Sequence, residues 1–331
     1  MKQLAALFVP LFLFGCARSV ITEPPVPFEN TYTAENTYQK EVKQFPHIEI
    51  ASLDTPDGVL VERNVTYVQY GRRALQLDLH RPEAGSFHPA VVLVHGGGWR
   101  SGYRENLTPL ANALAERGFV VANISYRLAP EARFPAAIHD VKAAIRWLRE
   151  NAEAYDVNPD RIAVGGTSAG GQIASLTGIT AGDPYFDPHQ AHSPVSSDVQ
   201  AILNIDGLSD FTSEEARHYE DDPSKNPSSA GSWFGGRYAE QTELWHKGSP
   251  IYYVHSDMPP ILFLNSARER FGVGRDEMIA KMEPLGVRYH VQRFDNTPHT
   301  FWLFDPWLQP TADEVSAFLR GIWGGTVTTS E

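Results

Sequence analysis

The sequence is poor in cysteine and in positive charge. Cys16 is the only cysteine among the 331 residues, so no disulfide can form within the chain. Lysine and arginine together number 28 against 40 aspartates and glutamates, and the formal net charge is −12. This balance argues against a nucleic-acid partner and against a basic membrane-binding face. Because 42% of the residues are hydrophobic and no repeat is present, the composition predicts a globular protein with a sizeable core.

Long apolar runs are also scarce, and the most distinct one lies at the start of the chain. Residues 4–14 follow Met1-Lys2 and are apolar throughout. This run is too short to span a bilayer as a helix but suits the core of a signal peptide. The closing Leu13-Phe14-Gly15-Cys16 resembles the bacterial lipobox, although Phe14 is bulkier than usual, and Ala17 resembles the outer-membrane sorting pattern.

These features predict a lipoprotein signal peptide over residues 1–15 and lipidation at Cys16. The expected location is the bacterial cell envelope, with the lipid anchor in the outer membrane. An ordinary secretory signal, cleaved nearby, is the alternative and would lead to a periplasmic or secreted protein.

The rest of the chain divides into a tether and one catalytic domain. Residues 16–46 are rich in Pro, Glu, Thr and Asn without apolar periodicity, which predicts a flexible tether. The domain is expected over residues 47–325. Its first strands are predicted at 48–53, 65–70 and 75–79, with antiparallel pairing at one sheet edge.

From Pro89 onward the pattern alternates between strands and helices, which predicts an α/β fold with a mainly parallel central sheet and helices on both faces. Strands are expected at 90–94, 119–124, 161–164, 199–205, 261–264 and 287–294. Helices are expected at 105–117, 135–151, 172–180 and 312–323, and around Ile279.

Residues 211–249 interrupt this rhythm with a polar segment that carries several aromatic side chains. An insertion of this length with aromatics favours a small lid or a substrate wall over disorder. Four tryptophans are candidates for a carbohydrate-facing wall or, equally, for the core: Trp99, Trp233, Trp245 and Trp302.

The main chemical signal is a serine between small residues where a strand gives way to a helix. In Gly166-Thr167-Ser168-Ala169-Gly170 the glycines permit the tight turn of a nucleophile elbow. Ser168 would stand at its tip, over the N-terminus of the next helix, where negative charge is favoured. Ser168 is therefore the predicted nucleophile.

A serine nucleophile needs a base, an orienting acid and donors for the developing oxyanion. The run His95-Gly96-Gly97-Gly98-Trp99 follows an apolar strand and supplies bare backbone N–H groups, which the N–H of Ala169 would join. Neither a P-loop lysine nor G-x-G-x-x-G is present, so the run does not indicate phosphate binding. His299, in the loop after the last strand, is the expected base, and His95 is expected to hold the glycine loop by hydrogen bonding.

Together these motifs resemble the α/β-hydrolase esterases of the hormone-sensitive-lipase-like group, and the related secreted carbohydrate esterases that remove acetyl or feruloyl groups. The matching stretches are His95–Trp99, Tyr126-Arg-Leu-Ala-Pro-Glu131, Phe134-Pro-Ala-Ala137 and Gly166–Gly171. The resemblance implies Ser168 as nucleophile, His299 as base and the N–H groups of Gly97, Gly98 and Ala169 as the oxyanion hole. Thr167 replaces the Asp common in the lipase-like branch, which favours the carbohydrate-esterase branch.

The acid is the least typical member of the expected triad. Families of this kind place it after the penultimate strand, often in His-Gly-x-x-Asp. The matching stretch here is Asn265-Ser266-Ala267-Arg268-Glu269, which predicts Glu269 as the acid. Asp206 and Asp210, after an earlier strand, are the alternatives.

The resemblance implies hydrolysis of carboxylic esters through an acyl-enzyme, on a small-molecule or carbohydrate substrate, without a metal or an organic cofactor. A peptidase or amidase would use the same residues. A hydrolase fold acting only as a binding module is the alternative outside enzymes, and the intact serine, histidine and glycine loop argue against it. The sequence leaves the oligomeric state open.

Overall fold

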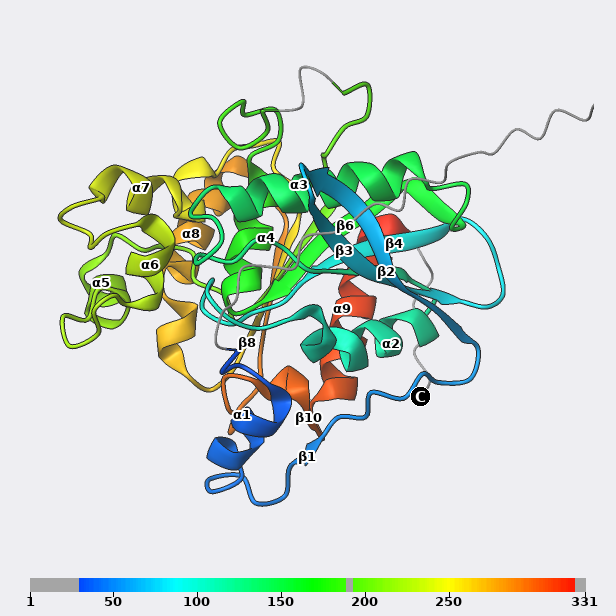
Figure 1. Cartoon of the computed structure of the whole chain (residues 1–331), viewed down its shortest axis with the longest axis horizontal. Coiled ribbons are helices and arrows are strands. Elements are labelled where there is room, and N and C mark those ends of the chain that lie inside the picture. Colours follow the sequence, from blue (N-terminus) through cyan, green and yellow to red (C-terminus); the bar gives the residue numbers. More distant parts are fainter. Residues whose placement is uncertain (1–29, 189–192, 325–331) are drawn as a thin grey trace, which may run out of the picture.

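The computed structural model describes residues 30–188 and 193–324. Cys16 and the predicted signal peptide lie outside the described residues. A single eight-stranded sheet forms the centre, in the order β2-β3-β5-β4-β6-β7-β8-β9 (Figure 1). Pairing is antiparallel from β2 through β3 to β5 and parallel across the rest. The expected α/β architecture with an antiparallel edge is therefore confirmed.

The strands lie where the apolar runs predict them. Their bounds are β2 Val59–Tyr70, β3 Arg73–Pro82, β4 His88–Val94, β5 Val120–Ile124, β6 Val157–Thr167, β7 Ala201–Ile205, β8 Ile261–Asn265 and β9 Tyr289–Arg293. All residues of β5, β7 and β8 are buried. Largely apolar strands that are buried throughout are expected where helices cover both faces of a parallel sheet.

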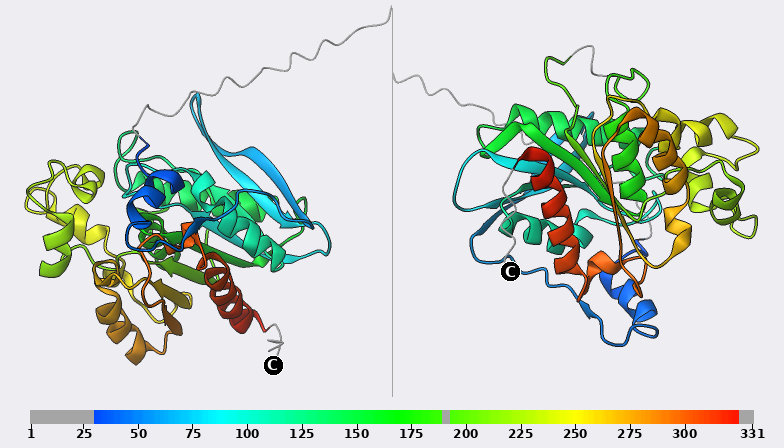
Figure 2. Two further views of the ribbon diagram at one scale, coloured as in Figure 1. Left: turned by 90° about the horizontal axis from the view of Figure 1, so that it is seen from below. Right: turned by 180° about the vertical axis from the view of Figure 1, so that it is seen from behind.

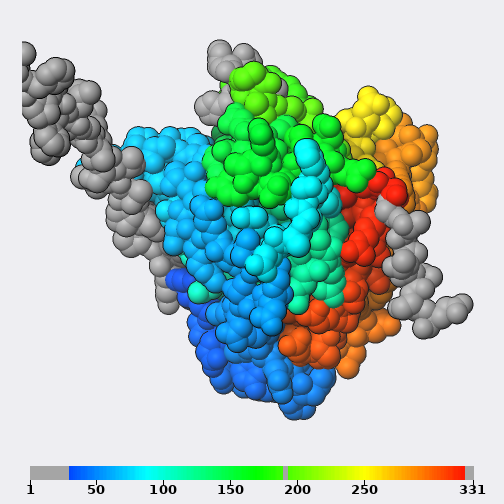
Figure 3. Space-filling model, turned by 90° about the vertical axis from the view of Figure 1, so that its right-hand side faces the viewer, coloured from blue at the N-terminus to red at the C-terminus, as the bar shows by residue number. Residues whose placement is uncertain are grey.

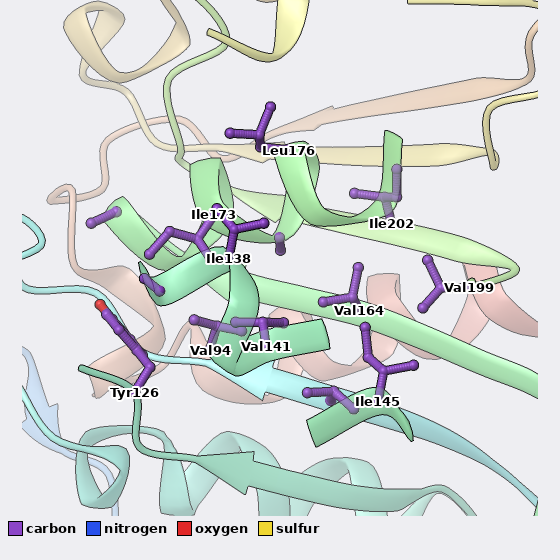
Figure 4. Close-up of a cluster of buried hydrophobic side chains, with 14 of the residues drawn as sticks. Val94, Tyr126, Ile138, Val141, Ile145, Val164, Ile173, Leu176, Val199 and Ile202 are labelled. Atoms are coloured by element: carbon purple, nitrogen blue, oxygen red, sulfur yellow. The ribbon is translucent and has the colours of Figure 1, made fainter. Parts of the chain in front are cut away.

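One face of the sheet is covered by α3, Ala136–Glu150, and α4, Ala169–Ile179. Ile138, Val141 and Ile145 recur along one side of α3 at helical spacing and are fully buried. Figure 4 shows them beside Val94 and Val164 of the central strands. This packing holds α4, which begins directly after Ser168, firmly against the sheet.

The other face is covered by α2, Thr108–Glu116, and α9, Leu308–Trp323, which contact each other (Figure 2). The helix predicted over 105–117 is in fact a 3₁₀ turn, η1 (Arg104–Leu107), followed by α2. The elements outside the insertion also include α8 Arg275–Met282 and the 3₁₀ turns η3 Pro250–Tyr253, η4 Glu269–Gly272, η5 Glu283–Leu285 and η6 Phe301–Leu303.

The insertion between β7 and β8 is folded and projects beyond one side of the sheet (Figure 2). It contains the short helices α5 Glu214–Glu220, α6 Ser229–Phe234 and α7 Thr242–Lys247. Trp233 and Trp245 are 1% and 0% exposed and pack with Phe211 and Phe234. Because Trp99 and Trp302 are also buried, all four tryptophans belong to the core, which is one of the two alternatives that the sequence left open.

The predicted tether is wrong for residues 30–46. Thr33 caps the helix α1, Ala34–Glu41, by accepting a hydrogen bond from the Asn36 N–H. Phe45 is 2% exposed and packs edge-on against Trp307, with ring centroids 5.7 Å apart. The polar composition of this segment predicts a tether, and the sequence does not show its packing because a partner such as Trp307 lies far along the chain.

Residues 30–50, which we call the N-terminal arm, end in a small second sheet. In it, β1, Glu49–Ile50, pairs antiparallel with β10, Phe304–Asp305, so the strand predicted over 48–53 is short and lies outside the main sheet. Figure 3 shows these blue N-terminal residues directly beside orange residues near the other end of the chain. Across residues 30–188 and 193–324, no helix combines the length and apolarity needed to cross a membrane.

Replacing Phe45 tests whether the arm belongs to the fold. Phe45→Ala removes a buried ring and should lower the free energy of unfolding by about 3–5 kcal/mol, measured by urea denaturation. Lys43→Ala, at an exposed position of the same turn, is the control and should change it by less than about 0.5 kcal/mol. Equal stability of the two variants would mean that the arm contributes nothing to the fold.

Candidate active site

Ser168 occupies a strained turn between β6 and α4. Its φ is 53° and its ψ is −122°, a conformation that L-residues seldom adopt and that persists only where the surroundings enforce it. A Cβ at Gly170 would lie 2.1 Å from the carbonyl oxygen of Val94, and one at Gly166 would lie 2.3 Å from that of Gly170. Only glycine fits at either position, so the predicted elbow is confirmed.

His299 meets Ser168 across the site. Its Nε2 lies 2.9 Å from Ser168 Oγ, within hydrogen-bond distance. His299 is in the loop between β9 and η6, as predicted. Its ring stacks face to face on Phe271, with centroids 3.3 Å apart and planes at 7°, and Trp302 lies edge-on to it. The two rings fix the plane of the imidazole.

The acid beside His299 is Asp206, and the prediction of Glu269 is wrong. Asp206 Oδ2 lies 2.7 Å from His299 Nδ1, and the carboxylate is completely buried. The Glu269 side chain is 84% exposed and lies 3.9 Å from Arg293. It begins η4, which turns the side chain toward solvent rather than toward the ring.

Asp206 is held by the segment in which the acid was expected. Its Oδ1 accepts hydrogen bonds from the Ser266 N–H, at 3.0 Å, and from Asn265 Nδ2, at 3.2 Å. Arg275 in turn donates to Asn265 Oδ1. Since burying a carboxylate is costly unless hydrogen bonds replace its water contacts, this set of contacts explains how Asp206 can be fully buried. Asp210 instead accepts from the Thr212 and Ser213 N–H groups at the start of the insertion.

The glycine loop lies opposite His299. Gly97 and Gly98 have φ values of 121° and 59°, which turn successive N–H groups in directions that L-residues with a Cβ rarely permit. The amides of Gly97, Gly98 and Ala169 donate to no acceptor among the described residues. Each residue borders a cavity that Ser168 also lines: Gly97 borders one cavity, Ala169 borders a second, and Gly98 borders both. They are thus free to donate to an oxygen bound beside the serine.

His95 supports this loop from behind, as expected. Its Nδ1 lies 2.7 Å from the carbonyl oxygen of Gly96, and its ring stacks on Tyr126, whose hydroxyl donates to the carbonyl oxygen of His95. Burial lowers the pKa of His95 to about 4, because desolvation disfavours the charged ring. His95 therefore stays neutral and can donate from Nδ1 at neutral pH.

Trp99 ties the glycine loop to the insertion. Its Nε1 donates to Gln172 of α4, and Gln172 donates to the carbonyl oxygen of Gly248. The indole also stacks on Trp233 of α6, with centroids 5.2 Å apart. Sequence reasoning missed this role, because Gln172 and Trp233 lie in separate segments far along the chain from Trp99.

Two cavities meet at Ser168. The outer cleft has a volume of about 640 Å³ and is bordered by His299, the glycine loop and polar residues of the N-terminal arm, including Lys40 and Glu41. The inner cavity, of about 100 Å³, is bordered by Trp99, Ala169, Leu208 and the pair Glu220 and Arg270. Phe271 borders both. The described residues contain no group of three or more His, Cys, Asp or Glu side chains placed to hold a metal ion.

Comparison with known proteins places this geometry among esterases. The chain is 34% identical over 209 residues to esterase LipQ of Mycobacterium tuberculosis, covering 62% of this chain and 48% of that protein. It is 32% identical over 211 residues to the probable carboxylic ester hydrolase LipM of the same organism, covering 62% and 47%. The chain thus spans about half the length of these curated relatives.

Solved structures share the fold at lower identity. A truncated carbohydrate esterase from gut microbiota superimposes with a TM-score of 0.68 at 21% identity, covering 83% of this chain and 99% of that one. Esterase 2 of Thermogutta terrifontis, phosphorylated by paraoxon, gives 0.65 at 22% identity, covering 83% and 98%.

The BD-FAE family matches residues 77–271, which is more than half of the chain and includes Ser168 and Asp206. The chain therefore belongs to the BD-FAE family, among the α/β-hydrolase esterases of the hormone-sensitive-lipase-like group.

Proposed function

We propose that this chain is a serine carboxylic-ester hydrolase that acts through an acyl-enzyme. The observation that carries the proposal is the continuous hydrogen-bonded line from Asp206 through His299 to Ser168. The glycine loop with its unpaired amides stands beside the serine. The esterase relatives support the same reaction class.

In the proposed reaction Ser168 Oγ attacks the ester carbonyl while His299 Nε2 takes its proton. The amides of Gly97, Gly98 and Ala169 stabilise the oxyanion, and His299 returns the proton to the leaving alcohol. Asp206 holds the Nδ1–H tautomer and stabilises the imidazolium. A water molecule then attacks the acyl carbonyl while His299 takes its proton. His299 returns this proton to Ser168 Oγ as the carboxylic acid leaves.

The position of His299 supports a placement of the two halves of the ester in the two cavities. The leaving alcohol must lie next to His299 to receive its proton, and His299 borders only the outer of these two cavities. The alcohol therefore belongs in the large polar cleft, and the acyl group belongs in the inner cavity.

Cavity size favours a short acyl group on a polar alcohol. The inner cavity of about 100 Å³ is smaller than the roughly 150 Å³ cavity that admits benzene, so an acetyl or similarly small acyl group suits it better than a feruloyl group. The polar lining of the outer cleft suits a carbohydrate. An amidase or peptidase would use the same catalytic residues, and activity on peptide or formamide substrates without ester hydrolysis would favour it.

The nucleophile is tested by Ser168→Ala. Turnover of p-nitrophenyl acetate should fall by about 10⁶-fold, as it does when a triad serine is removed elsewhere, with the far-UV circular dichroism spectrum unchanged. Hydrolysis within tenfold of the parent would remove Ser168 from the proposed role.

The acid is tested by the matched pair Asp206→Asn and Glu269→Gln. Asp206→Asn should lower kcat by about 10³- to 10⁴-fold, because an amide at Nδ1 favours the wrong tautomer of His299. Glu269→Gln, which alters an exposed side chain, should leave kcat within about twofold. The opposite ranking in steady-state assays would restore Glu269 as the acid.

We further propose that Cys16 is lipidated and anchors the protein in the bacterial outer membrane. The Leu13–Cys16 segment, with Ala17 after it, supports this proposal. Cys16→Ser should move the protein from the membrane fraction to the soluble fraction while kcat/KM stays unchanged. A parent protein that is already soluble and begins at another residue would contradict it.

A further inference from the structure

An ion pair borders the inner cavity and plays no part in the mechanism above. Arg270 Nη2 and Glu220 Oε1 lie 2.6 Å apart, and both residues border the cavity together with Ser168. Glu220 ends α5 of the insertion, whereas Arg270 belongs to η4 after β8. Two distant segments thus bring opposite charges to the same side of the reacting group.

The pair has unused hydrogen-bonding capacity. Arg270 Nε is buried and has no acceptor among the described residues. Glu220 is 7% exposed, and among those residues its carboxylate bonds to Arg270 through Oε1. Buried donors are nearly always paired, so the unpaired Nε–H of Arg270, at a residue that lines the cavity, indicates a polar group of a ligand.

Arg270 also lies against two aromatic rings. Its guanidinium carbon lies 5.2 Å from the ring centroid of Tyr219 and 4.7 Å from that of Phe271. Phe271 in turn stacks on His299. The ion pair is therefore only one aromatic ring away from the imidazole, close to where a short acyl chain would end.

The charges of Glu220 and Arg270 determine which polar group of a substrate could bind between them. A free carboxylate on the substrate would meet the Glu220 carboxylate, and an ammonium group would meet the Arg270 guanidinium. A neutral hydroxyl can donate to Glu220 and accept from Arg270 at the same time. We propose that Glu220 and Arg270 form a specificity site for a hydroxyl group on a short acyl chain. This inference rests on the proposed ester hydrolysis and on the placement of the acyl group in the inner cavity.

The test compares esters that differ by one hydroxyl. Methyl 3-hydroxybutyrate and methyl butyrate share the alcohol and the chain length, and each kcat/KM is divided by the hydroxide-catalysed rate of that ester. The parent enzyme should favour the hydroxy ester by tenfold or more, since a site built to bind a hydroxyl discriminates against the analogue that lacks it. A normalised ratio near one would overturn the inference without any variant.

The variants are Glu220→Gln and Arg270→Gln, alone and combined. The double variant removes both charges, so it leaves no unpaired charge buried even if a single variant fails to fold. Each folded variant should lose the preference for the hydroxy ester by about tenfold while hydrolysis of methyl butyrate changes much less. Arg237→Gln is the matched control, because it breaks the Arg237–Asp221 pair in the same insertion, at a different cavity.

Three results would contradict the inference. An equal loss on both esters would mean that the pair only positions Phe271 and His299. A gain on methyl hexanoate with an unchanged hydroxyl preference would make the pair a size limit. A loss confined to 2-hydroxyethyl acetate relative to propyl acetate would move the hydroxyl to the alcohol side. If the parent enzyme hydrolyses none of these esters or p-nitrophenyl acetate, the proposed function itself fails.

Discussion

The site depends on one buried carboxylate and the hydrogen bonds that hold it. Asp206 is fully buried, and Ser266, Asn265 and His299 offset the cost of its burial by bonding to its two oxygens. The backbone N–H of Ser168 donates to the carbonyl oxygen of Ile205, immediately before this acid. Nucleophile, acid and base are therefore fixed by the same edge of the sheet, at the carboxyl ends of its parallel strands.

The register of two neighbouring strands explains why the acid can come from either. Ile205 of β7 pairs with Leu264 of β8, so Asp206 and Asn265 follow at adjacent strand ends. The Asn265 amide donates a hydrogen bond to the Asp206 carboxylate, and the carboxylate also lies beside His299. Ser266 stands where the usual His-Gly-x-x-Asp pattern has glycine, and Asn265 brings an amide instead of an acid, so the end of β8 holds the carboxylate of Asp206 rather than supplying one.

Features that depend on residues close together in the sequence were predicted correctly. Continuous apolar strands, the stripe of α3 and the small residues around Ser168 depend on neighbours in sequence, and each lies where it was expected. The arm was wrongly predicted as a tether, and the tryptophans stayed open between wall and core, because their partners are remote: Phe45 packs on Trp307, and Trp99 packs on Trp233. An aromatic side chain gives the same sequence signal whether it faces a sugar or a core.

The catalytic side chains and the cavity walls come from different parts of the fold. Ser168, Asp206 and His299 are placed by the sheet, whose central strands are wholly buried. The cavity walls come from the insertion, the arm and η4, which lack a regular strand–helix rhythm. Trp99 and Gln172 join the two parts, because one bonded chain runs from the glycine loop through α4 to the insertion. The walls can therefore differ between relatives while the reacting atoms keep their positions, provided that this connection is preserved.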